Sequence, residues 1–190
     1  MSSKKILFLS LSFLLISCIQ SNKYEKAMDY FYPLEKGTVY IYKYGEFLIE
    51  RKIEDINLEK STIKISEKMS KEGKHKIMGK NIYIYEIKDN LIKVKRGIFK
   101  GSIQLKGPIK KGTKWKAKSY EFNIQEGKKV THVTKAWIDG FKEMNVFNSK
   151  RKCIVIKTYE IVGANRSIAT SIWCKGIGFV EGATSAGKIA

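Results

Sequence analysis

The sequence is poor in the residues that build catalytic and metal sites. It has only two histidines in 190 residues, His75 and His132, and neither has a Cys, Asp or Glu at metal-ligand spacing. A Gly-x-Ser-x-Gly nucleophile elbow is absent, and Cys18, Cys153 and Cys174 form no Cys-x-x-Cys pair. We therefore expect no catalytic residues, no metal, no cofactor and no enzymatic activity, and we expect His132 to be a surface or half-buried residue of a strand.

Arginine and long apolar runs are also scarce. Only four of the 37 basic residues are arginine, although the formal charge is +19. Arginine is the side chain suited to bidentate phosphate recognition, so its scarcity argues against nucleic acid as a partner. The lysines are spread along the whole chain, which is typical of a solvated basic surface and leaves an anionic envelope polymer as an alternative partner.

The N-terminus has the pattern of an export signal. Lys4 and Lys5 precede a largely apolar run at 6–16, which is shorter than the roughly 20 residues of a transmembrane helix but fits a signal peptide. Leu15–Cys18 resembles the bacterial lipobox, which implies cleavage after residue 17 and lipidation, including palmitate, at Cys18. The alternative is an ordinary secreted protein in which Cys18 is accidental. Two or more acyl chains give stable membrane attachment.

The location follows from that anchor. We expect a cell-envelope lipoprotein held on the membrane by its N-terminal lipid. Ile19 follows the lipidated cysteine, whereas an Asp there tends to retain lipoproteins at the inner membrane in Gram-negative bacteria. In a Gram-negative source, the sequence therefore predicts the outer membrane.

After a short tether at 18–28, the chain reads as a single β-rich domain at 29–190. Apolar and aromatic residues alternate with period two, the pattern of strands with one buried face. Ten strands are expected, at 39–44, 47–56, 62–66, 82–87, 91–95, 115–122, 129–138, 153–162, 168–173 and 178–180. Short strands at close spacing predict an all-β fold, an antiparallel meander curved into a half-barrel, barrel or sandwich.

One short pattern occurs twice, 75 residues apart. Pro33-Leu-Glu-Lys-Gly-Thr-Val-Tyr40 matches Pro108-Ile-Lys-Lys-Gly-Thr-Lys-Trp115, and these contain the only two prolines of the chain. Pro and Gly together favour a turn, and the aromatic residue then begins a strand. The repeat indicates either two similar β halves or one turn type used twice.

The same segments carry a family resemblance. Residues 30–42 resemble the opening of a group of bacterial lipoproteins of unknown function: an aromatic residue, Pro, Leu, two variable residues, Gly, two more, then Trp or Tyr, and a further Tyr. Residues 108–115 fit the mid-domain repeat of that motif, and Trp173–Val180 is similar to the closing strand of those proteins. The resemblance implies a curved all-β fold at the cell envelope and no particular activity.

Cys153 and Cys174 remain after lipidation, and hairpin geometry brings them together. If Gly163-Ala164 is a two-residue turn, residue 162 lies opposite 165, and counting outward places Cys153 opposite Cys174. Directly opposed residues lie within disulfide range, and the envelope permits disulfides. The alternative is two small buried thiols.

Aromatic residues gather on two of the expected strands. Tyr40, Tyr42 and Tyr44 share one strand face, and Tyr83 and Tyr85 share another. With Trp115, they form either part of the core or an aromatic platform on a concave sheet that holds a ligand.

Two functions follow from these patterns. In the first, a non-enzymatic lipoprotein binds a hydrophobic or anionic ligand, or a partner protein, on its curved sheet. In the second, a structural or surface-interaction lipoprotein has a filled core and acts through its basic outer face. An open apolar cavity favours the first, and a solid core favours the second.

Overall fold

The computed structural model describes residues 24–74, 76–123, 128–163, 165–184 and 187–189. The predicted signal peptide, Cys18 and His75 lie outside these residues. One 3-10 turn, η1 (Ala27–Tyr30), precedes twelve strands. They are β1 (Val39–Tyr44), β2 (Phe47–Asn57), β3 (Thr62–Lys71), β4 (Ile77–Lys88), β5 (Leu91–Arg96), β6 (Ile103–Lys106), β7 (Lys114–Asn123), β8 (Lys128–Val146), β9 (Ser149–Val162), β10 (Asn165–Cys174), β11 (Gly178–Thr184) and β12 (Gly187–Ile189).

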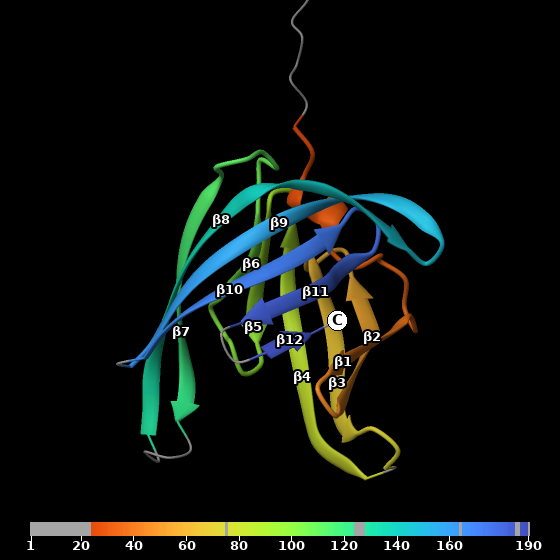
Figure 1. Cartoon of the computed structure of the whole chain (residues 1–190), viewed down its shortest axis with the longest axis vertical. Coiled ribbons are helices and arrows are strands. Elements are labelled where there is room, and N and C mark those ends of the chain that lie inside the picture. Colours follow the sequence, from red (N-terminus) through yellow and green to blue (C-terminus); the bar gives the residue numbers. More distant parts are fainter. Residues whose placement is uncertain (1–23, 75, 124–127, 164, 185–186, 190) are drawn as a thin grey trace, which may run out of the picture.

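The strands form one antiparallel sheet, which confirms the predicted all-β meander. Their order is β6-β5-β4-β3-β2-β1-β12-β11-β10-β9-β8-β7, so the first and last strands of the chain are neighbours in the middle of the sheet. The sheet curls around a common interior (Figure 1). Its edges approach each other where Trp115 of β7 donates an indole hydrogen bond to the Ile103 carbonyl of β6, at 3.2 Å.

The two copies of the repeated pattern occupy matching places in two six-stranded halves. Gly37, just before β1, donates its N–H to the Ile53 carbonyl of β2, and Gly112, just before β7, donates to the Ile138 carbonyl of β8, each at 2.8 Å. In both halves that isoleucine donates back to the threonine after the glycine. Both isoleucines also lie at a register shift. Of the two alternatives, the structure therefore favours two similar halves.

The longest hairpin extends beyond its expected limits. The predicted strand at 129–138 is part of β8, which continues to Val146, and β9 begins at Ser149, not at Cys153. The turn between them places Phe147 and Asn148 at φ 50° and 59°. Turns of this kind usually contain glycine, so Phe147-Asn148 is not recognisable as a hairpin turn from the sequence. Several other strands are also longer than expected, and β6 and β12 were not expected.

The N-terminal end of the described chain closes one end of the curled sheet. Ala27, Tyr30 and Phe31 are 0–1% exposed and belong to the main core. Glu25 forms an isolated bridge with Ile109, so packed structure begins inside the predicted tether at 18–28. None of the described helical residues forms a helix long and apolar enough to cross a membrane.

An aromatic cavity as the candidate binding site

The interior of the sheet is not completely filled. A partly open cavity of about 280 Å³ lies between the two halves and is lined by 22 residues. Eight of them are aromatic: Tyr32, Tyr42, Tyr83, Tyr85, Phe99, Trp115, Trp173 and Phe179. Its volume lies near the lower limit of small-molecule sites, which span roughly 300–1,000 Å³.

The predicted aromatic platform is brought together only in part. Tyr42, Tyr83, Tyr85 and Trp115 line the cavity. Tyr40 is half-buried and does not line it; its ring packs against Tyr32, at 4.9 Å between centroids, and burial raises its pKa to about 12. Tyr44 is half-buried at the end of β1, opposite Ile189, and does not line the cavity either.

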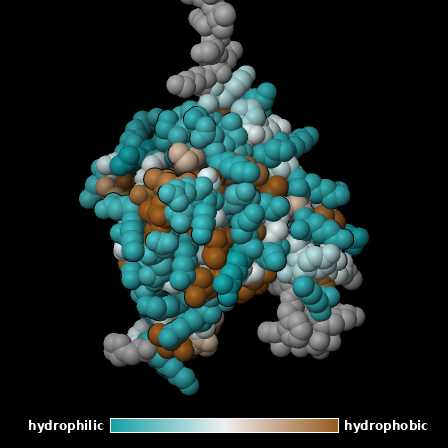
Figure 2. All heavy atoms as spheres, turned by 180° about the vertical axis from the view of Figure 1, so that it is seen from behind, coloured by the Kyte–Doolittle hydropathy of each residue, from teal (hydrophilic) through white to brown (hydrophobic). Residues whose placement is uncertain are grey.

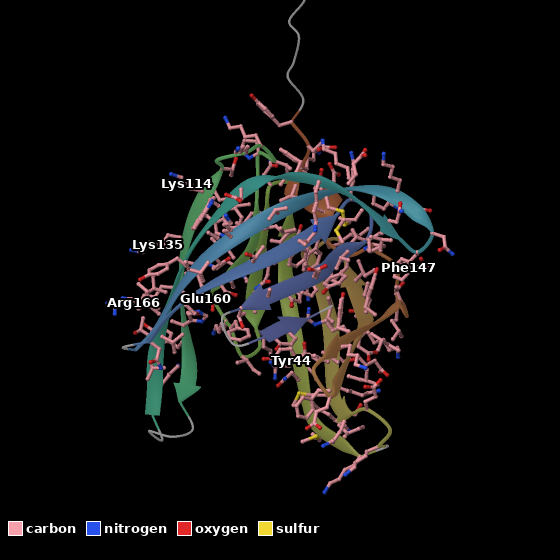
Figure 3. All side chains as sticks on the ribbon, viewed as in Figure 1. Tyr44, Lys114, Lys135, Phe147, Glu160 and Arg166 are labelled. Carbon is pink, nitrogen blue, oxygen red and sulfur yellow. A yellow bond between two sulfur atoms is a disulfide. The ribbon has the colours of Figure 1, made fainter. Side chains whose placement is uncertain are left out.

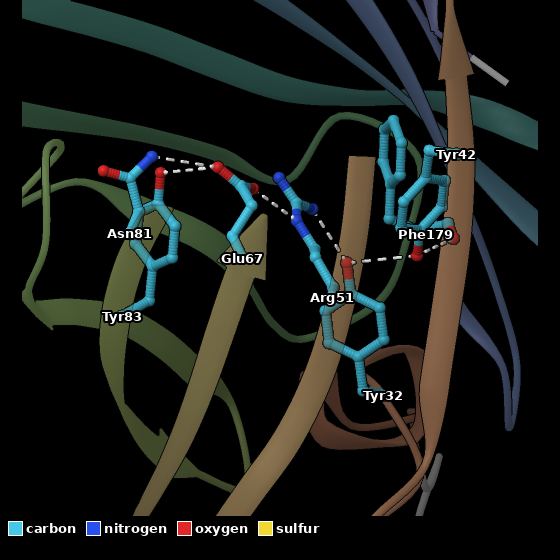
Figure 4. A network of polar contacts seen from close by, with 7 residues as sticks. All are labelled: Tyr32, Tyr42, Arg51, Glu67, Asn81, Tyr83 and Phe179. Atoms are coloured by element: carbon cyan, nitrogen blue, oxygen red, sulfur yellow. Dashed lines mark hydrogen bonds and ion pairs between the residues drawn. The ribbon is translucent and has the colours of Figure 1, made fainter. Parts of the chain in front are cut away.

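A hydrogen-bonded network crosses one wall of the cavity (Figure 4). Arg51 of β2 donates from Nε to Glu67 of β3 at 2.8 Å and from Nη1 to the Tyr32 hydroxyl at 2.9 Å. The other oxygen of Glu67 accepts from Tyr83 and from Asn81, each at 3.3 Å. The Tyr42 hydroxyl donates to the Phe179 carbonyl at 3.1 Å and lies 3.3 Å from the Tyr32 hydroxyl.

The ionisation states in this network follow from its surroundings. Burial acts to lower the pKa of Arg51, but the Glu67 carboxylate and the hydrogen bond to the Tyr32 hydroxyl outweigh it and hold the pKa well above its ordinary value. Burial raises the pKa of the Tyr42, Tyr83 and Tyr85 phenols. Arg51 therefore stays charged and these phenols stay neutral hydrogen-bond donors at physiological pH. The Arg51 charge is compensated by Glu67.

The opposite wall is built by β8, β9 and β10 and becomes polar along β8 and β9. On β8 the inward series runs from Ile138 through Ala136 and Thr134 to His132; on β9 it runs from Ile156 through Thr158 to Glu160. Glu160 accepts a hydrogen bond from Ser167 at 3.3 Å. Polar groups therefore gather toward one end of this wall.

His132 is the residue that sequence reasoning placed wrongly. It is only 6% exposed, and its ring packs edge to face against the Phe99 ring, with 5.9 Å between the ring centroids. Neither ring nitrogen has a hydrogen-bond partner among the described residues. The hydroxyl of Ser119, which lies directly opposite on β7, also has no partner among them. Its alternation with Ala136 was the signal that could have placed it inside. Within the described chain, no three His, Cys, Asp or Glu side chains converge as metal ligands.

The two cysteines lie away from the cavity. Cys153 and Cys174 are directly opposed in the β9–β10 register and are joined by a disulfide. The same register pairs residue 162 with 165, as the hairpin count predicts. Both belong to a separate hydrophobic cluster with Val146, Ile172 and Ile177, so this bridge is placed to stabilise the fold and not to act on a ligand.

A second hollow lies on the outer side of β7 and β8. Lys114, Lys116 and Lys135 line it together with Trp137 and Tyr159, and no carboxylate does. Figure 3 shows Lys114 and Lys135 projecting outward from the sheet. We call this set of five side chains the basic groove. The rear surface of the molecule is mostly hydrophilic, with apolar residues visible between the polar ones (Figure 2).

Two solved structures share this fold. One is of a Parabacteroides distasonis protein named as a lipoprotein, with a TM-score of 0.59, 9% identity, and coverage of 85% of this chain and 95% of that chain. The other is of a Bacteroides fragilis protein named as an exported protein with a YmcC-like fold, with a TM-score of 0.59, 8% identity, and coverage of 82% and 91%. No protein-family model and no curated protein matches the sequence. At these identities the likeness establishes the fold.

Proposed function

We propose that this chain is a lipid-anchored, non-enzymatic protein of the cell envelope that binds a small ligand inside its curled sheet. The observation that carries the proposal is the 280 Å³ cavity, with four of the predicted platform aromatics on its walls. The surface-interaction alternative requires a solid core, whereas the interior of the sheet contains this cavity. The names of the two proteins that share the fold are consistent with an exported protein.

The anchor is tested on the full chain expressed with its own signal in a bacterial host. Labelling with a palmitate analogue should mark the protein, and the label should disappear in Cys18→Ser. The variant should also leave the membrane fraction. Labelling that survives the substitution, or a wild-type chain recovered entirely as soluble secreted protein, would contradict lipid anchoring at Cys18.

Ligand binding is tested by native mass spectrometry of the full lipidated chain released from a detergent micelle. A bound molecule should appear as a discrete added mass. The matched variant is Ala136→Phe, which places a large side chain on the cavity wall, where Ala136 is 4% exposed. The added mass should disappear in that variant. A wild-type protein that never carries or takes up a ligand would contradict the proposal.

The basic groove favours a second candidate function, contact with an anionic envelope polymer. Three lysines without a carboxylate among them produce a local positive potential, and aromatic side chains beside them supply contact surface. Such binding weakens as salt increases, because exposed charges are screened beyond about 10 Å at 0.1 M. Retention on a polyanionic resin should therefore fall in Lys114→Gln/Lys116→Gln/Lys135→Gln, but not in a matched triple substitution at Lys64, Lys80 and Lys95 on other strands.

A further inference from the structure

The cavity contains hydrogen-bonding groups that the protein itself leaves unused. His132 is more than nine-tenths buried, faces the cavity and has two unpartnered ring nitrogens. Arg51 engages its Nε and Nη1, while no described residue accepts a hydrogen bond from Nη2, which points away from both partners in Figure 4. A buried polar group without a partner destabilises the protein, so a ligand that supplies the missing hydrogen bonds binds more tightly.

The unused groups specify both donors and acceptors. A neutral imidazole has one N–H donor and one acceptor nitrogen, whereas Nη2 of Arg51 can only donate. A hydroxyl group can donate and accept at once, so hydroxyls can satisfy all three nitrogens. An aliphatic chain can satisfy none of them.

The charges on the walls oppose a charged ligand. Arg51 is already paired with Glu67, and the remaining carboxylate on the wall is Glu160, which a ligand anion would have to face. A ligand cation would have to approach Glu160, the carboxylate on the wall, which already accepts a hydrogen bond from Ser167. Transfer of an unpaired ion into a largely apolar site is costly, so an uncharged ligand fits best.

The aromatic walls complete the description of the ligand. Aromatic rings present an electron-rich face, which attracts the weakly positive C–H groups of a saturated ring. We propose that the cavity binds a neutral sugar, with its C–H faces against Tyr83, Tyr85 and Trp115 and its hydroxyls on His132 and on Nη2 of Arg51. This inference rests on the proposed function and names its substrate class. The volume suits a compact ligand and excludes a diacyl lipid.

Tryptophan fluorescence tests the proposal directly. The chain has three tryptophans, and Trp115 and Trp173 line the cavity. In a Trp137→Phe background, emission from the full lipidated chain therefore reports on the cavity alone. We expect saturable changes on titration with N-acetylglucosamine, glucose or maltose, and none with laurate, an anionic amphiphile. Saturation by laurate but by none of the three sugars would overturn the sugar assignment and leave ligand binding standing. If no probe changes the fluorescence and native mass spectrometry finds no added mass, both the sugar assignment and the proposed ligand binding are contradicted.

Two variants separate a ligand contact from a structural role. His132→Phe keeps a ring and removes both nitrogens, so the sugar affinity should fall about tenfold while the thermal midpoint stays equal or rises, because an unpartnered polar group is lost. Thr134 lines the same wall next to His132. Thr134→Val removes its hydroxyl and should therefore also weaken binding without unfolding the protein, which provides the second test. Tyr120→Phe, at an exposed position of β7 outside both the cavity and the basic groove, is the control and should bind as wild type. Unchanged affinity in both wall variants, or a large loss of stability in His132→Phe, would overturn the assignment.

Discussion

At the scale of single residues, Arg51 of β2 contacts side chains from three other parts of the chain. Its guanidinium contacts Glu67 on β3 and Tyr32 before β1, and it lies over the Tyr42 ring of β1, 5.5 Å from the centroid. The side chains of Arg51 and Glu67 are 25% and 13% exposed. A pair this sheltered differs from a surface salt bridge, because removal of one partner leaves the other charged and poorly solvated.

Substitution of Arg51 should therefore be severe, and it should be partly repaired by a second change. Arg51→Met is expected to lower the free energy of unfolding by about 3 kcal/mol, since Glu67 becomes an unpaired, largely buried carboxylate. Arg51→Met/Glu67→Gln should recover part of that loss because the stranded charge is gone. Urea denaturation of the wild type and both variants measures the effect. Equal stability of wild type and single variant would show that the pair contributes nothing.

At the scale of elements, η1 is fastened to the sheet by a carboxylate that precedes it. Glu25 accepts hydrogen bonds from Tyr30 at 2.8 Å, from Lys152 of β9 at 2.6 Å and from Lys175 after β10 at 2.8 Å. Burial acts to raise the pKa of Glu25, but these hydrogen bonds outweigh it and lower the pKa from 4.5 to about 2. The N-terminal closure of the sheet therefore depends on an ionised Glu25.

This arrangement predicts a dependence of stability on acid. The folded pKa is depressed, so the contribution of Glu25 is complete above pH 4.5 and is lost as the pH falls toward 2. Both lysine partners are about half exposed, so solvent screening reduces the expected contribution to about 1 kcal/mol. Glu25→Gln should be less stable than wild type at pH 6, and the difference should shrink to nothing near pH 2. Thermal unfolding across this pH range measures it, and a constant difference at all pH values would contradict the assignment.

The disulfide fastens another pair of elements, β9 and β10. It closes a loop with a sequence separation of 21. Loops of that length predict a stabilisation of about 3 kcal/mol, mainly because the bridge restricts the unfolded chain. Cys153→Ser/Cys174→Ser should unfold at correspondingly lower urea, and a reducing agent should shift the wild type but not the variant. Insensitivity of the wild type to reduction would contradict a stabilising bridge.

At the scale of the whole molecule, the two six-stranded halves repeat each other's turn chemistry. Gly37 and Gly112 have φ of 91° and 86°, and nothing lies within 4 Å of where a Cβ would stand at either. An alanine would therefore meet no neighbour, but it would be forced into a left-handed backbone that L-residues avoid. The same substitution should have the same consequence in both halves.

The repeat therefore predicts that the same substitution lowers the free energy of unfolding equally in the two halves. Gly37→Ala and Gly112→Ala should each lower the free energy of unfolding by about 1–2 kcal/mol. Gly140→Ala is the control, because its backbone is not left-handed and the site is also open, so it should be neutral or mildly stabilising. Denaturation of the three variants measures this. Clearly unequal costs at the two repeated turns would argue against equivalent halves.

Local patterning was enough to predict the sheet, the β9–β10 register and the opposed positions of Cys153 and Cys174. Side-chain alternation has a period of two, and one hairpin turn fixes every pair counted outward from it. It was not enough for the long β8–β9 hairpin, whose turn residues Phe147 and Asn148 adopt positive φ without glycine. Alternation also could not separate Tyr42 from Tyr40, which share a strand face, because only the curvature of the sheet decides which of them reaches the cavity.

The sequence by itself determined the export signal pattern, the antiparallel strands and the repeated Pro-to-aromatic turn, since each depends on residues close together in the chain. Only the tertiary structure decided that β1 and β12 meet in the middle of the sheet, that Arg51 pairs with Glu67, and that His132 is buried without a partner. These depend on how far the sheet curls. Curling is a sum of small twists over twelve strands, and no single stretch of sequence encodes it.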